Sequence, residues 1–185
     1  VKKYIPNTAT YALIQNMILP FSKSDMSFDE IMDKWPDAVM HYPTYMALSF
    51  HNKNRLKDVS IRWYQSGTYP LQSLNYTYNE LISAEKDALI FTDANWTLFA
   101  SYLLQYGKGL FNDKKVIFSA LMLTPFSMNE LTEELGIPEF KDADPEFYKS
   151  KTPTMTFANE MKKRIEHIAK YTKRPIYISV STNEA

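Results

Sequence analysis

Three short runs of apolar residues in the second half of the chain constrain its fold more than any other feature of the sequence. Residues 88–92 read ALIFT, residues 115–123 read KVIFSALML, and residues 175–181 read PIYISVS. A short run that is apolar throughout is typical of a strand buried on both faces of a sheet. The three runs therefore predict three strands, and the helical patterns between them predict that these strands are parallel.

Amphipathic helices are predicted between the strands. In residues 96–106, one helical face collects five large apolar side chains, namely Leu98, Phe99, Tyr102, Leu103 and Tyr106. Residues 127–136 open with a capping-box pattern that runs from Ser127 to Glu130, and residues 157–172 are amphipathic. We therefore expect an α/β fold, with a three-layer-like parallel sheet of at least three strands joined by helical crossovers.

The first half of the chain is predicted to be mostly helical. The stretch SFDEIMDKW combines a capping box with a short helix, and Pro43 suits the first turn of another. The stretch LKDVSIRWYQSG fits both a strand and a helix, and we favour the helix. With one more helix at 71–84, we expect a helical part over residues 1–85 and an α/β part over residues 86–185, packed as one compact unit.

Composition limits the classes of partner and site. The chain has 21 Lys and Arg, 21 Asp and Glu, and no Cys. A net charge of zero gives no overall field to attract nucleic acid or an anionic membrane, so we expect no nucleic-acid partner. Without Cys there are no disulfides, thiolate metal ligands or Cys nucleophiles.

The start of the chain and its hydropathy bear on the membrane. No stretch approaches the roughly 20 apolar residues that a transmembrane helix needs. The chain begins at Val1 rather than Met, and we expect a trimmed or mature product. A membrane would then be reached only through a segment outside this chain.

Polar residues follow the predicted strands at their carboxyl ends, where open parallel sheets bind ligands. The candidate ligand-binding residues are Thr92, Asp93, Asn95 and Thr97 after the first strand, Thr124 and Ser127 after the second, and Ser181 and Asn183 after the third. Helix N-termini at the same edge would add free amides that attract anions. This arrangement indicates a small polar pocket for a sugar or a phosphate.

The turn after the first strand also has a simpler interpretation. The helix that begins near Trp96 needs an acceptor for its first amides, and Asp93 or Asn95 could serve as its N-cap. Both interpretations stay open at this point. We hypothesise that the turn serves the helix first and a ligand second.

No metal or cofactor site is expected. Asp142 and Asp144 have the D-x-D spacing with which nucleotide-sugar enzymes hold a divalent ion, but they lie in a proline-rich stretch that we interpret as a solvated loop. His41, His51 and His167 share no metal-ligand spacing. The sequence also lacks a nucleotide-binding glycine loop and a nucleophile elbow.

The stretch ALIFTDANWTLFASYLLQYG, followed by DKKVIFSALML, resembles the pattern A-I-L-F-T-N-G-D-N-D-T-F-P-L-W-Y-L-Q and D-V-x-V-x-N-x-x-L-L. That pattern belongs to a bacterial family of large membrane proteins. In this family, a polytopic half similar to protein O-mannosyltransferases precedes an extracytoplasmic region that often carries tetratricopeptide repeats. The run Arg174-Pro175-Ile176-Tyr177-Ile178 is similar to a later R-P-I-Y-F strand of the family.

The turn after the first strand departs from the family pattern. The family's N-G-D-N-D-T is shortened here to Asp93-Ala94-Asn95-Trp96-Thr97. The resemblance therefore carries over only to Asp93, Asn95 and Thr97, and it implies a reduced polar site. Transfer chemistry would reside in the membrane half, which this sequence does not contain.

Two functions follow as hypotheses. The first is an extracytoplasmic, periplasmic or membrane-anchored α/β domain of a bacterial envelope protein, which binds a small polar ligand or a protein partner without catalysis. The second is the soluble part of an enzyme that acts on glycans or sugar phosphates through the Asp93–Thr97 turn. A buried Asp93 in a pocket would favour the enzyme, whereas an aromatic surface patch would favour the binding domain.

Overall fold

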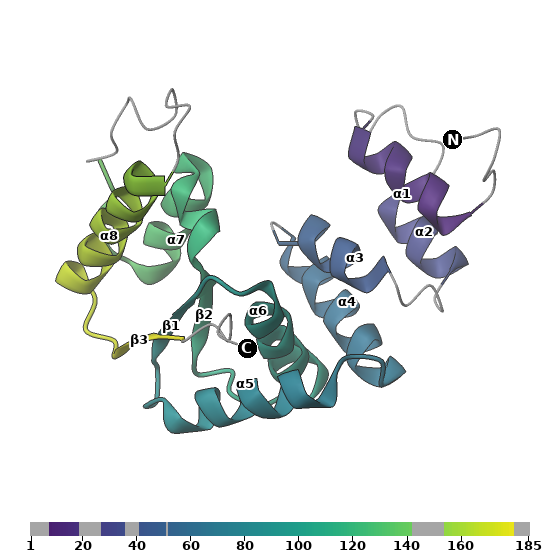
Figure 1. The fold of residues 1–185 in the computed structure, drawn as a ribbon, viewed down its shortest axis with the longest axis horizontal. Helices are drawn as coiled ribbons and strands as arrows, with labels where there is room; N and C mark the ends of the chain where they lie inside the picture. The colour runs from purple at the N-terminus through teal and green to yellow at the C-terminus, as the bar shows by residue number, and fades with distance from the viewer. Residues whose placement is uncertain (1–7, 19–26, 36–40, 51, 142–153, 180–185) are drawn as a thin grey trace. The chain divides into compact units, whose positions relative to one another are not determined.

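The chain divides into two compact units, and a computed structural model gives the fold of each (Figure 1). The first unit spans residues 1–68 and the second residues 69–185. The ranges that the structure describes are 8–18, 27–35, 41–50, 52–141 and 154–179. The division falls after Thr68, so the helix predicted at 71–84 belongs to the second unit rather than to the N-terminal part. The expectation of one compact unit stays a prediction.

The described part of the first unit is helical, as predicted. Its helices are α1 (Ala9–Ile18), α2 (Phe28–Lys34), α3 (Tyr42–Leu48) and α4 (Lys53–Ser66). The capping box of α2 is confirmed, because Ser27 Oγ accepts from the Glu30 amide and Glu30 Oε2 accepts from the Ser27 amide. The ambiguous stretch is the helix α4, whose buried face includes Val59 and Trp63. The ring of Tyr42 stacks on Trp63, with 5.6 Å between centroids, and joins α3 to α4.

The second unit is an α/β fold, as predicted. Its elements in chain order are α5 (Leu71–Ser83), β1 (Leu89–Thr92), α6 (Asn95–Tyr102), the π-helix η3 (Leu103–Gly107), β2 (Lys115–Phe118), the 3₁₀-helix η4 (Ser119–Leu123), α7 (Pro125–Leu135), α8 (Thr154–Tyr171) and β3 (Ile176–Ile178). Three parallel strands form the sheet in the order β2-β1-β3. The chain therefore moves from β1 to β2 and then back across β1 to β3.

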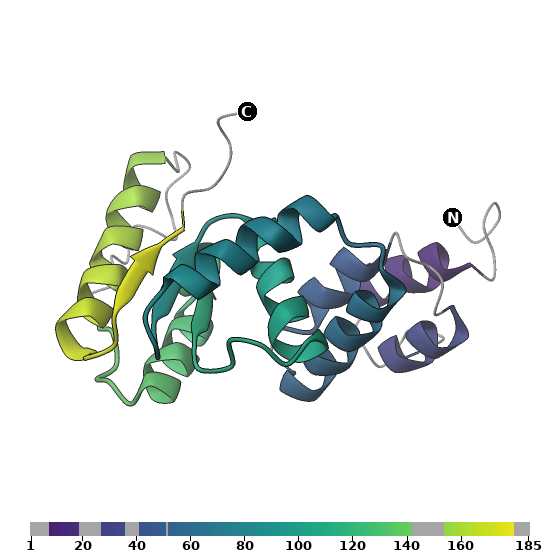
Figure 2. The same ribbon diagram turned by 90° about the horizontal axis from the view of Figure 1, so that it is seen from below.

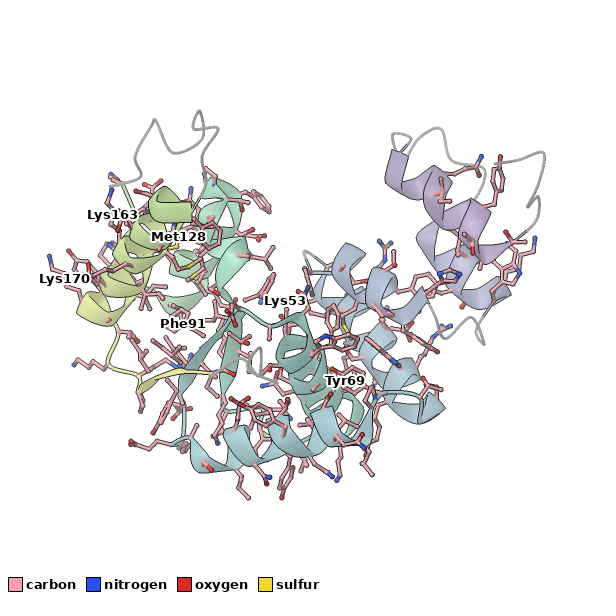
Figure 3. The ribbon with its side chains drawn as sticks, viewed as in Figure 1. Lys53, Tyr69, Phe91, Met128, Lys163 and Lys170 are labelled. Atoms are coloured by element: carbon pink, nitrogen blue, oxygen red, sulfur yellow. The ribbon has the colours of Figure 1, made fainter. Side chains whose placement is uncertain are left out.

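Helices cover both faces of this sheet (Figure 2). On the face of α7 and α8, Leu89 and Phe91 of β1 pack in one buried cluster with Ile117, Met128 and other apolar side chains. Helices α5 and α6 lie on the opposite side. All four residues of β1 are buried, as expected for a central strand with helices on both faces. Figure 3 shows Phe91 and Met128 in the same interior region.

Two predicted elements continue as a 3₁₀- or π-helix before their predicted ends. The predicted strand 115–123 stops at Phe118, because β1 offers no partner beyond Thr92, and the chain continues as η4. The predicted helix 96–106 widens into a π-helix from Leu103, where the Lys108 amide donates to the Leu103 carbonyl. The buried Gln105 in this turn donates to the carbonyls of Phe111 and Lys114, at 3.1 and 2.9 Å. The widened turn thus fixes the loop that leads into β2.

Arg174 joins the starts of the three strands. It precedes β3, and its guanidinium donates to the carbonyls of Asp87, before β1, and Asp113, before β2, at 2.5 and 3.4 Å. Asp87 and Phe111 have left-handed backbone angles, with φ of 60° and 55°. Backbone carbonyls at these turns that lie outside the sheet ladder need donors from elsewhere. Arg174 and Gln105 supply those donors and stabilise the amino edge of the sheet.

Candidate functional site

The turn after β1 is held by a buried threonine. Thr92 is 2% exposed, and its hydroxyl oxygen accepts from the Ala94 amide at 3.1 Å. Its carbonyl accepts from the Ser119 hydroxyl at 2.9 Å, which fastens the end of β1 to the residue that follows β2. Thr92 therefore uses its polar groups within the fold and leads the chain from the sheet into α6.

The N-cap of α6 is Ala94, which has no side-chain acceptor. Asn95 is the first helical residue and Asp93 precedes the cap, so the prediction that one of them is the N-cap is wrong. The reason is local, since the Thr92 hydroxyl takes the Ala94 amide and starts the helix one residue earlier than expected. Asp93 and Asn95 are both exposed, and Thr97 is buried in α6.

The second candidate segment caps α7. Thr124 is the N-cap, and its hydroxyl oxygen accepts from the Ser127 amide at 3.2 Å. The hydroxyls of Thr124 and Ser127 also lie 2.9 Å apart. The predicted capping box from Ser127 to Glu130 is wrong, because α7 already begins at Pro125. Thr124 and Ser127 thus both serve the start of the helix.

Two exposed aromatic residues stand beside these turns, and the sequence analysis missed them as site residues. Trp96 is 57% exposed and Phe126 is 62% exposed. Each occupies the second position of its helix, in α6 and α7. A signal for Trp96 existed, because this residue lies outside the apolar face of its own helix. Phe126 was missed because the helix was predicted to begin at Ser127, whereas α7 begins at Pro125 and includes Phe126.

Tyr69 contacts Trp96 through a hydrogen bond and through its ring. Tyr69 is buried, its hydroxyl donates to the Trp96 carbonyl at 2.6 Å, and the two ring centroids lie 6.3 Å apart. Burial raises the pKa of the Tyr69 hydroxyl above its ordinary value. The first turn of α6 is therefore held in place while the indole of Trp96 remains accessible.

The segments after β1 and β2 carry acidic side chains but no basic ones. Residues 93–107 and 116–140 contain no Lys or Arg, whereas Asp93 and Glu130 are exposed in them. Basic residues occur instead at the amino edge, where Lys114 and Arg174 precede strands and Lys115 is the first residue of β2. The two segments that follow β1 and β2 are therefore neutral to acidic, and each carries one exposed aromatic side chain.

Ser179, directly after β3, bonds within the fold. After β3, the Ser179 amide donates to the Phe91 carbonyl at 2.8 Å and its hydroxyl donates to Glu80 of α5 at 2.7 Å. This pair connects α5 to the end of the sheet. The candidates Ser181 and Asn183 lie outside the described residues.

A buried carboxylate on α8 is paired with two cationic side chains. Glu160 and Arg164 are both almost fully buried and form an ion pair at 2.5 Å, and Lys163 binds the other oxygen of the same carboxylate at 2.6 Å. Burial alone would raise the pKa of Glu160, but the hydrogen bonds from Lys163 and Arg164 hold it below its usual range. Arg164 also lies 4.9 Å from the ring centroid of Phe140. The cluster joins α8 to the segment after α7.

The remaining candidates are the two aspartates with D-x-D spacing and the three histidines. Asp142, Asp144 and His51 lie outside the described residues. His41 Nε2 lies 3.2 Å from the Thr10 hydroxyl, and His167 Nε2 lies 2.7 Å from the Pro138 carbonyl. Within the described ranges, no three His, Asp or Glu side chains are grouped as a metal site would require. In the same ranges, no helix combines the length and apolar character needed to cross a bilayer.

Comparisons with known proteins leave the family open. The chain matches no protein-family model, no curated protein and no solved structure.

Proposed function

We propose that this chain is a non-catalytic binding domain of a bacterial envelope protein, acting outside the cytoplasm. Its binding surface is formed by Asp93, Asn95, Trp96, Thr124 and Phe126, which we call the aromatic edge surface. The surface follows β1 and β2, on the side where parallel sheets bind ligands. The strand order reverses between β1 and β3, which is the usual place of ligand binding in open α/β sheets, and the turn after β1 with Asp93, Asn95 and Trp96 borders this place.

One observation carries the proposal. In the turn after β1, the buried hydroxyl of Thr92 is used within the fold, whereas the indole of Trp96 is 57% exposed. A tryptophan has a large apolar area and a polar N–H group, and this combination makes Trp enriched at interfaces. Asp93 and Asn95 supply a polar rim here. The turn thus supports binding at a surface rather than reaction in a cleft.

Catalysis on glycans or sugar phosphates is the competing hypothesis, and the geometry favours it less. Such chemistry uses paired acid and base groups in a site from which water is excluded. Asp93 is exposed to solvent, and Thr92 and Thr97 are buried. If the wild-type chain turns over a glycan or a sugar phosphate and Asp93→Ala does not, the non-catalytic part of the proposal is contradicted.

The extracytoplasmic location is supported by the resemblance of residues 75–124 to the envelope family. Protease treatment of intact cells, and of cells with a permeabilised outer layer, tests it in the native organism with an antibody against this domain. Cleavage before the cytoplasmic membrane is breached is the expected result. Protection until the cytoplasm is opened would contradict the envelope location.

Binding at the aromatic edge surface is tested with a mixed panel of neutral glycans, sugar phosphates, nucleotides and peptides. Trp96→Ala should weaken the binding of whichever compound the wild-type chain retains by at least about tenfold, because the main apolar contact is gone. Phe157→Ala is the matched control, since Phe157 is an exposed aromatic residue on α8, outside the surface. If no panel member binds, or if both variants bind like wild type, the surface is not a ligand site.

A further inference from the structure

From the make-up of the aromatic edge surface, we infer that its ligand is an uncharged oligosaccharide stacked on Trp96. This inference rests on the proposed function and adds the chemical class of the ligand. It depends on three features of the described residues: a supported and accessible indole, hydrogen-bonding side chains beside it, and the absence of positive charge in the segments that form the surface.

The accessible indole suits the apolar face of a sugar ring. A pyranose has C–H groups on one face and hydroxyls around its rim, so it buries apolar area on a flat aromatic ring while its hydroxyls stay hydrated or hydrogen-bonded. Trp96 is exposed, yet its backbone is fixed by the hydroxyl of the buried Tyr69 at 2.6 Å. A fixed platform lowers the ordering cost of binding. Phe126, 62% exposed, provides a second accessible ring in the next segment.

The polar side chains next to Trp96 suit hydroxyl groups. Asp93 offers carboxylate oxygens as acceptors, and Asn95 offers both an amide donor and a carbonyl acceptor. Both are exposed and lie within three residues of Trp96, around the start of α6. A sugar hydroxyl both donates and accepts, so this pair can satisfy it in either sense.

Charge argues against an anionic ligand. A helix N-terminus after a strand would by itself attract phosphate. Here the carboxylate of Asp93 precedes the first turn of α6, and residues 93–107 and 116–140 contain no Lys or Arg. Negative charge near a helix N-terminus is already favourable to the helix dipole, and it repels a second anion. Sugar phosphates, nucleotides and acidic glycans are therefore disfavoured.

The experiment measures affinity by calorimetry for three neutral probes, cellohexaose, mannohexaose and chitohexaose, and for three anionic probes, hexagalacturonate, glucose 6-phosphate and ATP. We expect at least one neutral hexasaccharide to bind and the anionic probes to bind at least about tenfold more weakly. Trp96→Ala should reduce the affinity for the neutral probe at least about tenfold. Trp96→Phe, which keeps an aromatic face, should retain it within about fivefold, and Phe157→Ala should match wild type.

The outcomes separate this inference from the function on which it rests. Trp96-dependent binding of an anionic probe or of a peptide, with no binding of neutral glycans, overturns the ligand class and leaves the binding surface in place. If Trp96→Ala still binds the neutral hexasaccharide as wild type does, the stacking role of Trp96 is overturned. If nothing in either panel binds to wild-type protein, the proposed function fails and this inference fails with it.

Discussion

The two edges of the small parallel sheet use polar groups in opposite ways. At the amino edge, backbone carbonyls before the strands accept from buried or partly buried side chains, Gln105 and Arg174. At the carboxyl edge, Thr92 and Ser119 complete the internal bonds, and the larger side chain of Trp96 remains exposed. The amino edge therefore stabilises the fold, while the carboxyl edge has side chains available to a ligand.

Leu103→Asp should destabilise both edges of the sheet. Leu103 is fully buried in η3, at the end of the helix that starts at the carboxyl edge and leads to the amino edge. An unpaired carboxylate in that position should cost several kcal/mol and unfold the second unit. Urea denaturation followed by circular dichroism measures the loss. A midpoint like that of wild type would mean that this helix does not anchor the sheet.

Gln105→Met should weaken the amino edge specifically. The change keeps the side-chain length but removes the donor to the carbonyls of Phe111 and Lys114, so we expect a loss of about 2 kcal/mol in unfolding free energy. Asn112→Ala is the matched control, because its side chain donates to Gly109 in the same loop but is exposed. Equal effects of the two changes would contradict the role assigned to Gln105.

Arg174→Ala should have a smaller effect on the same edge, about 1 kcal/mol, because its bond to Asp113 is long and Arg174 is only partly buried. Lys173→Ala removes an exposed neighbouring charge and should be neutral. Chemical denaturation of both variants gives the comparison. If Lys173→Ala costs as much as Arg174→Ala, general charge rather than the bonds to the strand starts explains the effect.

The smallest effect of the series is expected at the carboxyl edge, in Asn95→Ala. Thr92→Val keeps the shape but removes the acceptor of the Ala94 amide, and should cost about 1 kcal/mol. Asn95→Ala should stay within about 0.5 kcal/mol of wild type, because Asn95 is not the N-cap. Thermal melts rank the two variants. A loss in Asn95→Ala larger than that in Thr92→Val would reinstate Asn95 as the residue that holds the turn.

The sequence predicted the central strand and the class of fold because those depend on local apolar runs. All four residues of β1 are buried, and the strands are parallel, as expected. The sequence could not place the end of β2, since that end depends on where β1 stops. The sequence also could not show that α5 belongs to the second unit. The bond between Glu80 and Ser179 joins α5 to residues far along the chain.

The details of the candidate site were predictable only in part. The sequence located the turn after β1, but assigned its cap to charged and amide side chains rather than to the Thr92 hydroxyl. The start of α7 could have been found, because Pro125 directly after Thr124 is typical of a first helical turn. The support of Trp96 by Tyr69 spans 27 residues and has no local signal.

The strand order has a consequence for synthesis on the ribosome. β1 lies in the middle of the sheet, yet its second neighbour is complete only at Ile178, which is 86 residues after Thr92 (178 − 92). At about 5 to 20 residues per second, translation of that interval takes roughly 4 to 17 s. Throughout it, one side of the nascent central strand lacks β3. A chaperone that shields unpaired strands would therefore have its longest opportunity to act on β1.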